Sequence, residues 1–335
     1  MVKKKWSLLA GIAVAALMVT GCSSGSDAPA EGPATGGEES SEMASVTIGV
    51  VPVVDFAPEY IALREGIFEK YNLDVTIEVV QNFSAAVPSL MNGQLQFAGG
   101  ALPPIIAAID SGVPLKVVVG NSASVQDPEL DANQMVTKPG AGIDRPADMA
   151  GKTIAVNQIG SGPHIGALGE YLNDGGEPGA VEWVSMPFPE MVAAVEAGTV
   201  DGAAITEPFL TNALNAGLEQ VFSVYIEPGV EVIEKGSPFV ALVATDEYLA
   251  ENADVAKRVR DAVAEAADLA AADRSLVETV LIEDSGMDPE VAAQLRLPGF
   301  AGTPSAATLQ ALTDVMSGAG MVSPDLRGED MIWNP

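Results

Sequence analysis

The chain has 335 residues, with 46 Asp and Glu against 16 Lys and Arg, and its formal net charge is −30. This acidity argues against nucleic acid as a partner, because phosphate binding needs clustered Lys and Arg. With a single Cys and a single His, the chain also lacks the residues for a disulfide or a zinc site built from those ligands. We expect no metal and no cofactor.

The first residues have the layout of an export signal. Three lysines at positions 3–5 precede an apolar run over residues 6–18 and a small-residue junction that ends at Cys22. The run is too short to span a bilayer, which needs roughly 20 residues. The junction resembles a bacterial lipobox, in which the Cys thiol carries the lipid. We therefore predict a signal peptide over residues 1–21 and lipidation of Cys22; the alternative is an ordinary signal with a chance Cys.

Residues 22–45 are expected to form a disordered tether. They are rich in Gly, Ser, Pro and Glu and contain almost no large apolar side chain. Such a segment does not bury enough surface to offset the entropy of ordering it. Apolar runs return at Val46, and the rest of the chain is long enough for one large or two medium domains.

Strands and amphipathic helices alternate in the next part of the chain. Apolar periodicity predicts, in order, strand 46–51, helix 59–70, strand 73–80, helix 85–92, strand 95–98, helix 103–110 and strand 115–119. Four strands joined by three helices indicate a mainly parallel sheet that helices cover on both faces.

The alternation then restarts. The predicted elements are strand 134–137, strand 152–157, helix 164–174, strand 181–186, helix 189–197, strand 202–206, helix 208–215, strand 220–225 and strand 239–244. From Asp246 to Met321 the chain is expected to be almost wholly helical. We interpret this as an α/β protein with two lobes: 46–136 begins lobe 1, 137–237 is lobe 2, and 238–335 completes lobe 1. Two crossings near 136–138 and 236–238 would form a hinge beside a cleft.

Four segments in this order resemble the solute-binding proteins of nitrate, sulfonate, taurine and thiamine-precursor importers. Residues 55–75 are similar to the family's opening loop and helix, and residues 90–98 to its L-x-x-G-x-x-D pattern, with Gln96 where Asp is usual. Residues 143–156 are close to I-x-S-P-A-D-L-K-G-K-x-I-A-V, and residues 191–209 match A-L-x-x-G-x-V-D-A-A followed by E-P.

The resemblance implies the two-lobed periplasmic-binding-protein fold of type II, which closes on a small molecule. It implies an ABC permease as partner and, through it, a cytoplasmic ATPase, with a monomer on the outer face of the cell membrane (periplasm or cell surface) held by the lipid at Cys22. It implies no enzymatic activity: pyrimidine synthases of this fold carry a Cys-rich motif and essential His residues, which this chain lacks. A ligand-sensing lipoprotein of the same fold is a second alternative.

Candidate ligand contacts lie in the loops at the carboxyl ends of the predicted strands, where such folds bind ligands. Asp55 and Phe56 follow the first strand; Asp55 would bind an amine or a ring N–H, or else cap the next helix. Gly100 and Ala101 belong to a predicted Gly-Gly loop, and Asn121 follows the fourth strand.

Two further candidate sites lie in the second lobe. Gly160, Ser161 and Gly162 begin a predicted helix whose free amides attract an acceptor, worth roughly 0.3–2 kcal/mol. Glu207 follows the last strand of that lobe and would bind ligand donors; the alternative is a hinge or helix-start role. His164 is expected at the surface.

The charge of these loops limits the chemical class of the ligand. They contain no Lys or Arg, whereas Asp55 and Glu207 are acidic. A strongly hydrated anion normally requires a guanidinium fork. We therefore expect a small polar organic molecule that is neutral or cationic, such as a pyrimidine-like precursor or an amine. A sulfonate held by helix termini and hydroxyls is the alternative.

Overall fold

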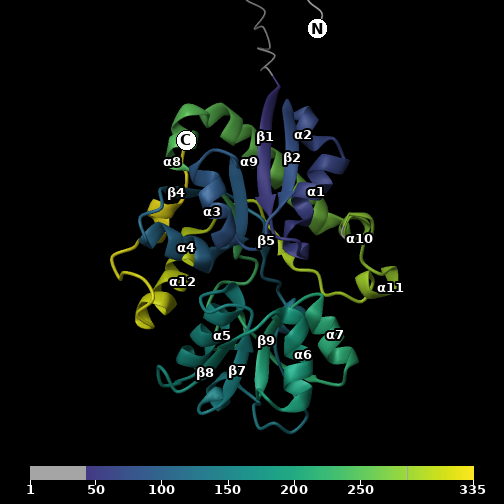
Figure 1. Ribbon diagram of the computed structural model, residues 1–335, viewed down its shortest axis with the longest axis vertical. Coiled ribbons are helices and arrows are strands. Elements are labelled where there is room, and N and C mark those ends of the chain that lie inside the picture. The colour runs from purple at the N-terminus through teal and green to yellow at the C-terminus, as the bar shows by residue number, and fades with distance from the viewer. Residues whose placement is uncertain (1–42, 285) are drawn as a thin grey trace, which may run out of the picture. The chain divides into compact units, whose positions relative to one another are not determined.

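The computed structural model describes residues 43–284 and 286–335. The predicted signal peptide, the lipid anchor at Cys22 and most of the predicted tether lie outside the described residues. Two five-stranded sheets organise the part of the chain that is described (Figure 1). No helix in these ranges has the length and apolar character that a membrane crossing requires.

The first sheet has the strand order β2-β1-β3-β11-β4. Strand β1 pairs in parallel with β2 and β3, whereas β11 pairs antiparallel with β3 and β4. All strands but β11 therefore share one direction. The strands are β1 (Ala44–Val50), β2 (Leu73–Val79), β3 (Phe97–Ala101), β4 (Leu115–Gly120) and β11 (Val240–Thr245).

The second sheet repeats this plan with the order β10-β6-β9-β7-β8. Strand β7 pairs in parallel with β8 and β9, whereas β6 pairs antiparallel with β9 and β10. The strands are β6 (Asn133–Thr137), β7 (Thr153–Val156), β8 (Glu182–Ser185), β9 (Gly202–Thr206) and β10 (Glu219–Ser223).

The antiparallel strand of each sheet is the one by which the chain arrives from the other sheet. Such a strand begins at the edge where the other strands end, so it runs against them. Both sheets are mainly parallel, as the alternation of strands and helices predicts.

The chain leaves the first sheet earlier than expected. Residues 133–137 already pair within the second sheet, so the crossing comes before 133 and not near 136–138. Strand β5 (Ser122–Ala123) precedes it. The return crossing lies beside the first one, because Ala123 bridges Pro238 and the N–H of Ser124 donates to the carbonyl of Ser237 at 3.0 Å.

One predicted helix of the first sheet is two helices in the structure. Residues 59–70 form α1 and α2 because Gly66 adopts a left-handed conformation, with φ of 67°, which ends the first helix. The connecting helices of this sheet are α1 (Ala57–Arg64), α2 (Ile67–Lys70), α3 (Phe83–Met91) and α4 (Leu102–Asp110).

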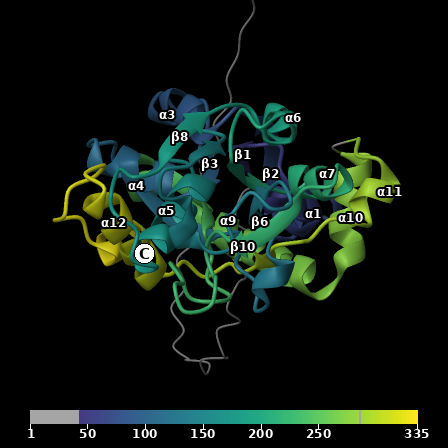
Figure 2. The same cartoon turned by 90° about the horizontal axis from the view of Figure 1, so that it is seen from below.

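Helices cover both faces of the second sheet (Figures 1 and 2). In β9, Ala203 and Ile205 belong to the apolar cluster of α6 and α7, whereas Ala204 between them belongs to the cluster that contains Ile165 of α5. This is the alternation of a strand buried on both faces. The helices are α5 (Gly162–Asn173), α6 (Phe188–Ala197) and α7 (Phe209–Asn215).

The C-terminal part is mostly helical, with one strand that the expectation missed. The two-residue strand β12 (Gly299–Phe300) pairs antiparallel with β5. Helix α12 contacts both α4 and α5, so the end of the chain packs against helices of both sheets. The helices are α8 (Asp246–Glu251), α9 (Ala253–Ala272), α10 (Arg274–Glu283), α11 (Pro289–Ala292) and α12 (Ala306–Gly318).

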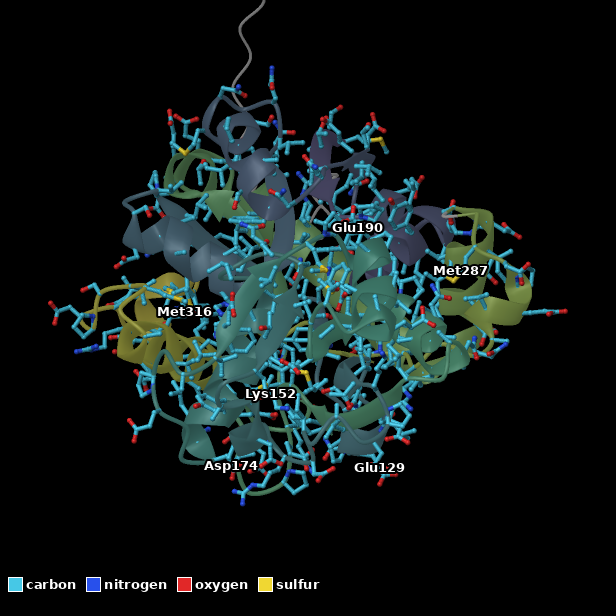
Figure 3. All side chains as sticks on the ribbon, turned by 60° about the horizontal axis from the view of Figure 1, so that its bottom comes forward. Glu129, Lys152, Asp174, Glu190, Met287 and Met316 are labelled. Carbon is cyan, nitrogen blue, oxygen red and sulfur yellow. The ribbon has the colours of Figure 1, made fainter. Side chains whose placement is uncertain are left out.

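Carboxylate side chains are spread over the surface of the described residues (Figure 3). Glu129 and Glu190 are exposed, and Asp174 forms an ion pair with Arg145. These carboxylates thus lie in solvent or in a surface ion pair, which is the usual arrangement of scattered acidic residues.

Candidate functional site

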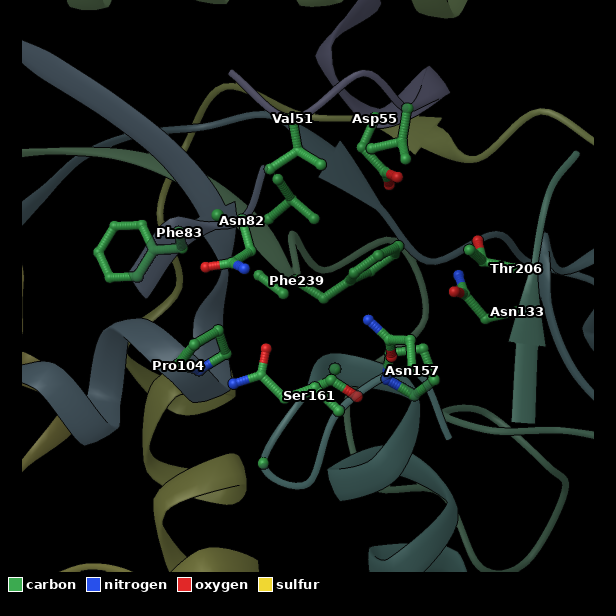
Figure 4. A pocket seen from close by; sticks show the side chains of 18 of the residues that line it. Val51, Asp55, Asn82, Phe83, Pro104, Asn133, Asn157, Ser161, Thr206 and Phe239 are labelled. Atoms are coloured by element: carbon green, nitrogen blue, oxygen red, sulfur yellow. The ribbon is translucent and has the colours of Figure 1, made fainter. Parts of the chain in front are cut away.

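A cavity of about 250 Å³ lies between the facing edges of the two sheets (Figure 4). Its walls come from both sheets and from the segments that connect them. The lining residues are Val51, Val53, Asp55, Phe56, Gln81, Asn82, Phe83, Ser84, Gly100, Ala101, Pro104, Asn133, Asn157, Gln158, Gly160, Ser161, Gly162, Pro163, Phe188, Thr206, Tyr225, Phe239 and Val240.

Strand direction explains why these residues meet. The carboxyl ends of the parallel strands face the cavity, and the antiparallel strands β6 and β11 begin there. Asn157 follows β7 and Thr206 ends β9, while Asn133 begins β6. The cavity therefore occupies the position that ligands take in open α/β sheets.

Asp55 carries the only carboxyl among the described residues that line the cavity. It lies in the short helix η1 (Val54–Phe56), and its Oδ1 accepts a hydrogen bond from Ser122 Oγ. Burial raises the pKa of Asp55, and the bond from Ser122 partly opposes that rise. The carboxyl points into the cavity in Figure 4. It does not cap α1, because no side-chain capping bond is made at that helix start.

Two glycines let aromatic rings approach β3 from opposite faces. A Cβ on Gly99 would lie 2.1 Å from Phe56 Cε1, and one on Gly100 would lie 2.8 Å from the Phe83 ring. Residues 99–101 belong to β3, paired with β11, so the expectation of a Gly-Gly loop there is wrong. The glycines serve the cavity by making room for the two rings.

A second aromatic pair comes from the segments between the sheets. The rings of Tyr225 and Phe239 stack with centroids 5.0 Å apart and an angle of 23°. Burial raises the pKa of Tyr225 well above its usual range, and the charges of Asp131 and Asp55 add to the shift. The phenol is therefore a neutral hydrogen-bonding group in the cavity wall.

Amide and hydroxyl groups complete the wall on the side of the second sheet. Asn157 Oδ1 is buried and has no hydrogen-bond partner within the described part of the chain. Asn133 Nδ2 approaches Asp131 Oδ1 at 3.4 Å, and Thr206 lies beside it (Figure 4). A buried acceptor without a partner is costly unless a ligand donor or a water satisfies it. Asn157 is thus suited to accept from a ligand N–H.

The start of α5 differs from the expected row of free amides. Pro163 has no N–H, the N–H of His164 donates to Ser161 Oγ at 3.5 Å, and the N–H of Gly160 donates to His164 Nδ1 at 2.9 Å. Gly160, Ser161 and Gly162 do line the cavity. Most of the donors that an anion would need are already engaged or absent.

His164 is buried, so the expectation of a surface position is wrong. Its side chain accepts from Gly160 and packs edge-on against Trp183, with ring centroids 4.7 Å apart. Burial lowers the pKa of His164 to about 4. The imidazole is therefore neutral at physiological pH, and it holds the 158–162 loop in place.

Asn121 and Glu207 do not line the cavity. Asn121 is fully buried and its Nδ2 donates to Glu59 Oε1 at 2.7 Å. Glu207 accepts from the N–H and the hydroxyl of Thr211, each at 2.9 Å, and from the N–H of Arg296 at 3.0 Å. The helix-start role, stated as the alternative for Glu207, is the one that the structure shows.

Several cavity residues were absent from the sequence-based candidates. Asn157 and Thr206 lie at the carboxyl ends of β7 and β9, so the rule that selected Asp55 would have found them had it been applied to every strand. Asn133 begins the antiparallel strand β6, so that rule does not select it. Tyr225 ends the predicted strand 220–225 and so meets the same rule, whereas Phe239 begins a predicted strand. The stacking of the two rings depends on how the two crossings meet, which the sequence does not show.

Comparisons with known proteins agree with this architecture. Residues 39–280 match the model of the NMT1-like family. The nitrate/nitrite binding protein NrtA of Nostoc sp. is 26% identical over 79% of this chain and 65% of its own length. The taurine-binding periplasmic protein of Escherichia coli is 30% identical over 39% of this chain and 38% of its own length. In both cases the chain spans less than two thirds of the relative.

Solved structures match over most of the chain. The alkanesulfonate-binding protein SsuA from Xanthomonas axonopodis pv. citri, bound to MOPS, has a TM-score of 0.71 at 19% identity, covering 88% of this chain and 99% of that one. The periplasmic nitrate-binding protein NrtA from Synechocystis has a TM-score of 0.67 at 17% identity, covering 87% and 85%. The expected periplasmic-binding-protein fold is confirmed.

Proposed function

Because the chain belongs to the NMT1-like family, we propose that it is the extracytoplasmic solute-binding component of an ABC importer. In this proposal each five-stranded sheet is the core of one lobe, and the paired crossings near Ala123 and Pro238 form the hinge. The lobes close on a small molecule in the cavity and present it to a permease that a cytoplasmic ATPase drives. The protein acts as a monomer and not as an enzyme.

The proposed ligand class rests on one observation. Among the described residues, the lining of the cavity contains a single carboxyl and several aromatic rings but no cationic side chain. None of the described residues that line it is Lys, Arg or His. The aromatic side chains are Phe56, Phe83, Phe188, Tyr225 and Phe239. A ring stacked between such groups, with an N–H or a positive charge at Asp55, uses the attraction between cations and aromatic faces.

The same features disfavour an anionic ligand. The relatives are by name binding proteins for nitrate, taurine and alkanesulfonate. An anion here would face Asp55 without a guanidinium fork to offset the repulsion, and the engaged amides at the start of α5 leave it few donors. We propose a neutral or cationic nitrogen compound, such as a pyrimidine-like ring or an amine, instead of a sulfonate.

The cavity volume supports a ligand of one ring. About 250 Å³ is below the roughly 300–1,000 Å³ that is typical of sites for drug-sized molecules. The cavity therefore suits a ligand smaller than a drug-sized molecule, such as a single ring with its substituents.

We also propose that Cys22 anchors the protein to the outer face of the cell membrane. The support is the lipobox-like junction and the tether-like composition of the residues that follow it. Replacing Cys22 with Ala should move the protein from the membrane to the soluble extracytoplasmic fraction. Continued retention on the membrane would refute the anchor.

A thermal-shift screen tests the function. The probes are 4-aminopyrimidine, 4-aminopyridine and simple amines, compared with nitrate, taurine and an alkanesulfonate. A ligand at a hundred times its dissociation constant adds about 2.7 kcal/mol of stability. We expect stabilisation by nitrogen heterocycles and none by the anions. Stabilisation by the anions alone would contradict the proposed ligand class but not the solute-binding role.

A further inference from the structure

Two neighbouring hydrogen bonds join the start of α1 to the segment that leaves the first sheet. Ser122 Oγ donates to Asp55, which lines the cavity, and Asn121 Nδ2 donates to Glu59 Oε1 at 2.7 Å. Asn121 is itself fixed through its backbone, because its N–H donates to the carbonyl of Val240 at 2.9 Å. The bond to the cavity carboxyl therefore lies one helical turn from a second bond between the same two segments.

The second contact contains an unusual pair of unpartnered atoms. Glu59 Oε2 and Asn121 Oδ1 are both buried, and neither has a hydrogen-bond partner among the described residues. Both side chains are fully buried. Two buried acceptors left unsatisfied beside each other destabilise the fold, because each has given up its bonds to water and gained none in the protein.

A proton on Glu59 Oε2 gives both of these oxygens a hydrogen-bond partner, since Oε2 then donates to Asn121 Oδ1. A carboxylic acid and a primary amide form a cyclic pair, in which the amide N–H donates to the acid carbonyl and the acid O–H donates to the amide oxygen. The observed bond from Nδ2 to Oε1 is the first half of that pair, and the two unpartnered oxygens are the atoms that the second half joins.

The surroundings of Glu59 favour its neutral form. The buried side chains of α9, which packs on α1, are Ala and Val. The ionisable groups nearby on η1, on α1 and at the end of α10 are Asp55, Tyr60 and the ion pairs of Arg64 with Glu283 and Asp284. None of them donates a hydrogen bond to Glu59. Burial raises the pKa of Glu59 to about 8, although the bond from Asn121 opposes the rise.

We propose that Glu59 is a positioning residue: it is protonated in the folded protein, forms a cyclic acid–amide pair with Asn121, and so fixes the adjacent Ser122–Asp55 bond that orients the cavity carboxyl. The effect on ligand binding rests on the proposed function of the cavity. The acid–amide pair itself does not.

The first experiment measures the protonation of Glu59 directly in the full chain. Carbon-13 NMR follows the side-chain carboxyl signals between pH 5 and about pH 9, and the Glu59 signal is identified by its loss in Glu59→Gln. We expect this signal to titrate with a midpoint near 8. A Glu59 signal that does not titrate above about pH 5, as expected for a carboxyl at its ordinary value of 4.5, would overturn the proposal.

The second experiment tests positioning with matched variants. Glu59→Gln keeps both hydrogen bonds, since its amide N–H donates to Asn121 Oδ1, whereas Glu59→Leu removes both. In Glu59→Leu the titration midpoint of Asp55 should rise further, because the Ser122 bond that opposes the rise is no longer held in place, and in Glu59→Gln it should stay as in the unaltered protein. Equal Asp55 midpoints in the two variants would refute the positioning role. If Glu59→Leu does not fold, strong destabilisation by Glu59→Gln would still overturn the paired geometry.

The ligand arm uses 4-aminopyridine as the probe. Glu59→Gln should bind it as the unaltered protein does, and Glu59→Leu about tenfold more weakly or worse. Normal binding by Glu59→Gln would show that the hydrogen bonds of residue 59, and not its charge, support ligand binding. If Glu59→Leu bound the probe as tightly as the unaltered protein, the positioning role would be wrong. If the unaltered protein does not bind the probe, the proposed ligand class fails, while the two carboxyl titrations still decide the inference.

Discussion

At the scale of single residues, the cavity concentrates its charge on Asp55. No lysine, arginine or histidine among the described lining residues neutralises it, and the phenol of Tyr225 is neutral. A ligand cation or N–H is therefore the group best suited to balance this carboxyl when the ionised form is present.

Asp55→Asn should weaken binding of 4-aminopyridine by about tenfold or more, because a hydrogen bond to a charged group is worth about 1.5–3 kcal/mol. Isothermal titration calorimetry measures the loss. Asp144→Asn, which changes an exposed carboxyl, is the matched control and should bind normally. Unchanged binding by Asp55→Asn would exclude a direct contact.

Glu207 has a structural role, so its replacement should affect stability. Its carboxylate holds the start of α7 through Thr211 and reaches the N–H of Arg296 in the segment before β12. Glu207→Ala should lower the free energy of unfolding by about 1.5–3 kcal/mol, measured by urea denaturation.

The exposed residue Glu190 provides the control for that measurement, since Glu190→Ala should change stability by no more than about 0.5 kcal/mol. The folded Glu207→Ala protein should still respond to ligand. If Glu207→Ala no longer bound ligand while its free energy of unfolding stayed unchanged, Glu207 would be a ligand contact and not a structural residue.

At the scale of elements, helix α5 is held by a close approach of backbone to backbone. A Cβ on Gly166 would lie 2.1 Å from the carbonyl oxygen of Val224, and the Tyr225 ring is close on the same side. The helix therefore rests directly on the segment that carries a cavity residue.

Gly166→Ala should destabilise the protein by about 1–3 kcal/mol, because a backbone atom must move. Gly318→Ala is the control, since Gly318 lies in α12 with no atom within 4 Å of a Cβ there. It should be neutral or stabilising by up to about 1 kcal/mol. Thermal unfolding compares the two; equal melting temperatures would contradict the close packing.

Apolar periodicity was enough to predict most elements of both sheets, but not the short or irregular ones. The two-residue strands β5 and β12 exist only because the first crossing pairs with a segment of the C-terminal part, which no local pattern records. Gly99 and Gly100 look like a turn in the sequence. They form a strand because β11, which follows far along the chain, pairs with them.

The candidate site was predicted in part for similar reasons. Asp55 and the 160–162 loop follow predicted strands, and the structure brings them to one cavity. Asn121 and Glu207 follow strands as well, yet their side chains bond to Glu59 and to the backbone of Arg296. The sequence does not reveal these partners, because Glu59 and Arg296 lie far along the chain from Asn121 and Glu207 and meet them only in the folded protein.

At the scale of the whole molecule, buried carboxyls should set how stability depends on pH. Burial raises the pKa of Glu59 to about 8, and that of Asp55, Asp131 and Glu170 as well. A carboxyl whose pKa is higher in the folded state stabilises the fold below its unfolded value. That contribution is lost as pH rises through the folded value.

The free energy of unfolding should therefore fall between pH 6.5 and about pH 8.5, and Glu59→Gln should reduce the fall. His164 has the opposite sign: because its folded pKa is about 4, its contribution is complete above 6.5 and lost as pH falls below that. Urea denaturation at constant ionic strength measures the profile. Greater stability at the alkaline end would contradict it.

Strand β11 makes the order of synthesis differ from the order of strands in the first sheet. It lies between β3 and β4 in the first sheet, yet the ribosome makes it only after every strand of the second sheet. A nascent chain that ends before residue 240 would hold all the strands of the second sheet and leave β3 and β4 with unpaired inner edges, which are open to wrong partners. Phe239 arrives with β11, so the last strand to join the first sheet also supplies one wall of the cavity.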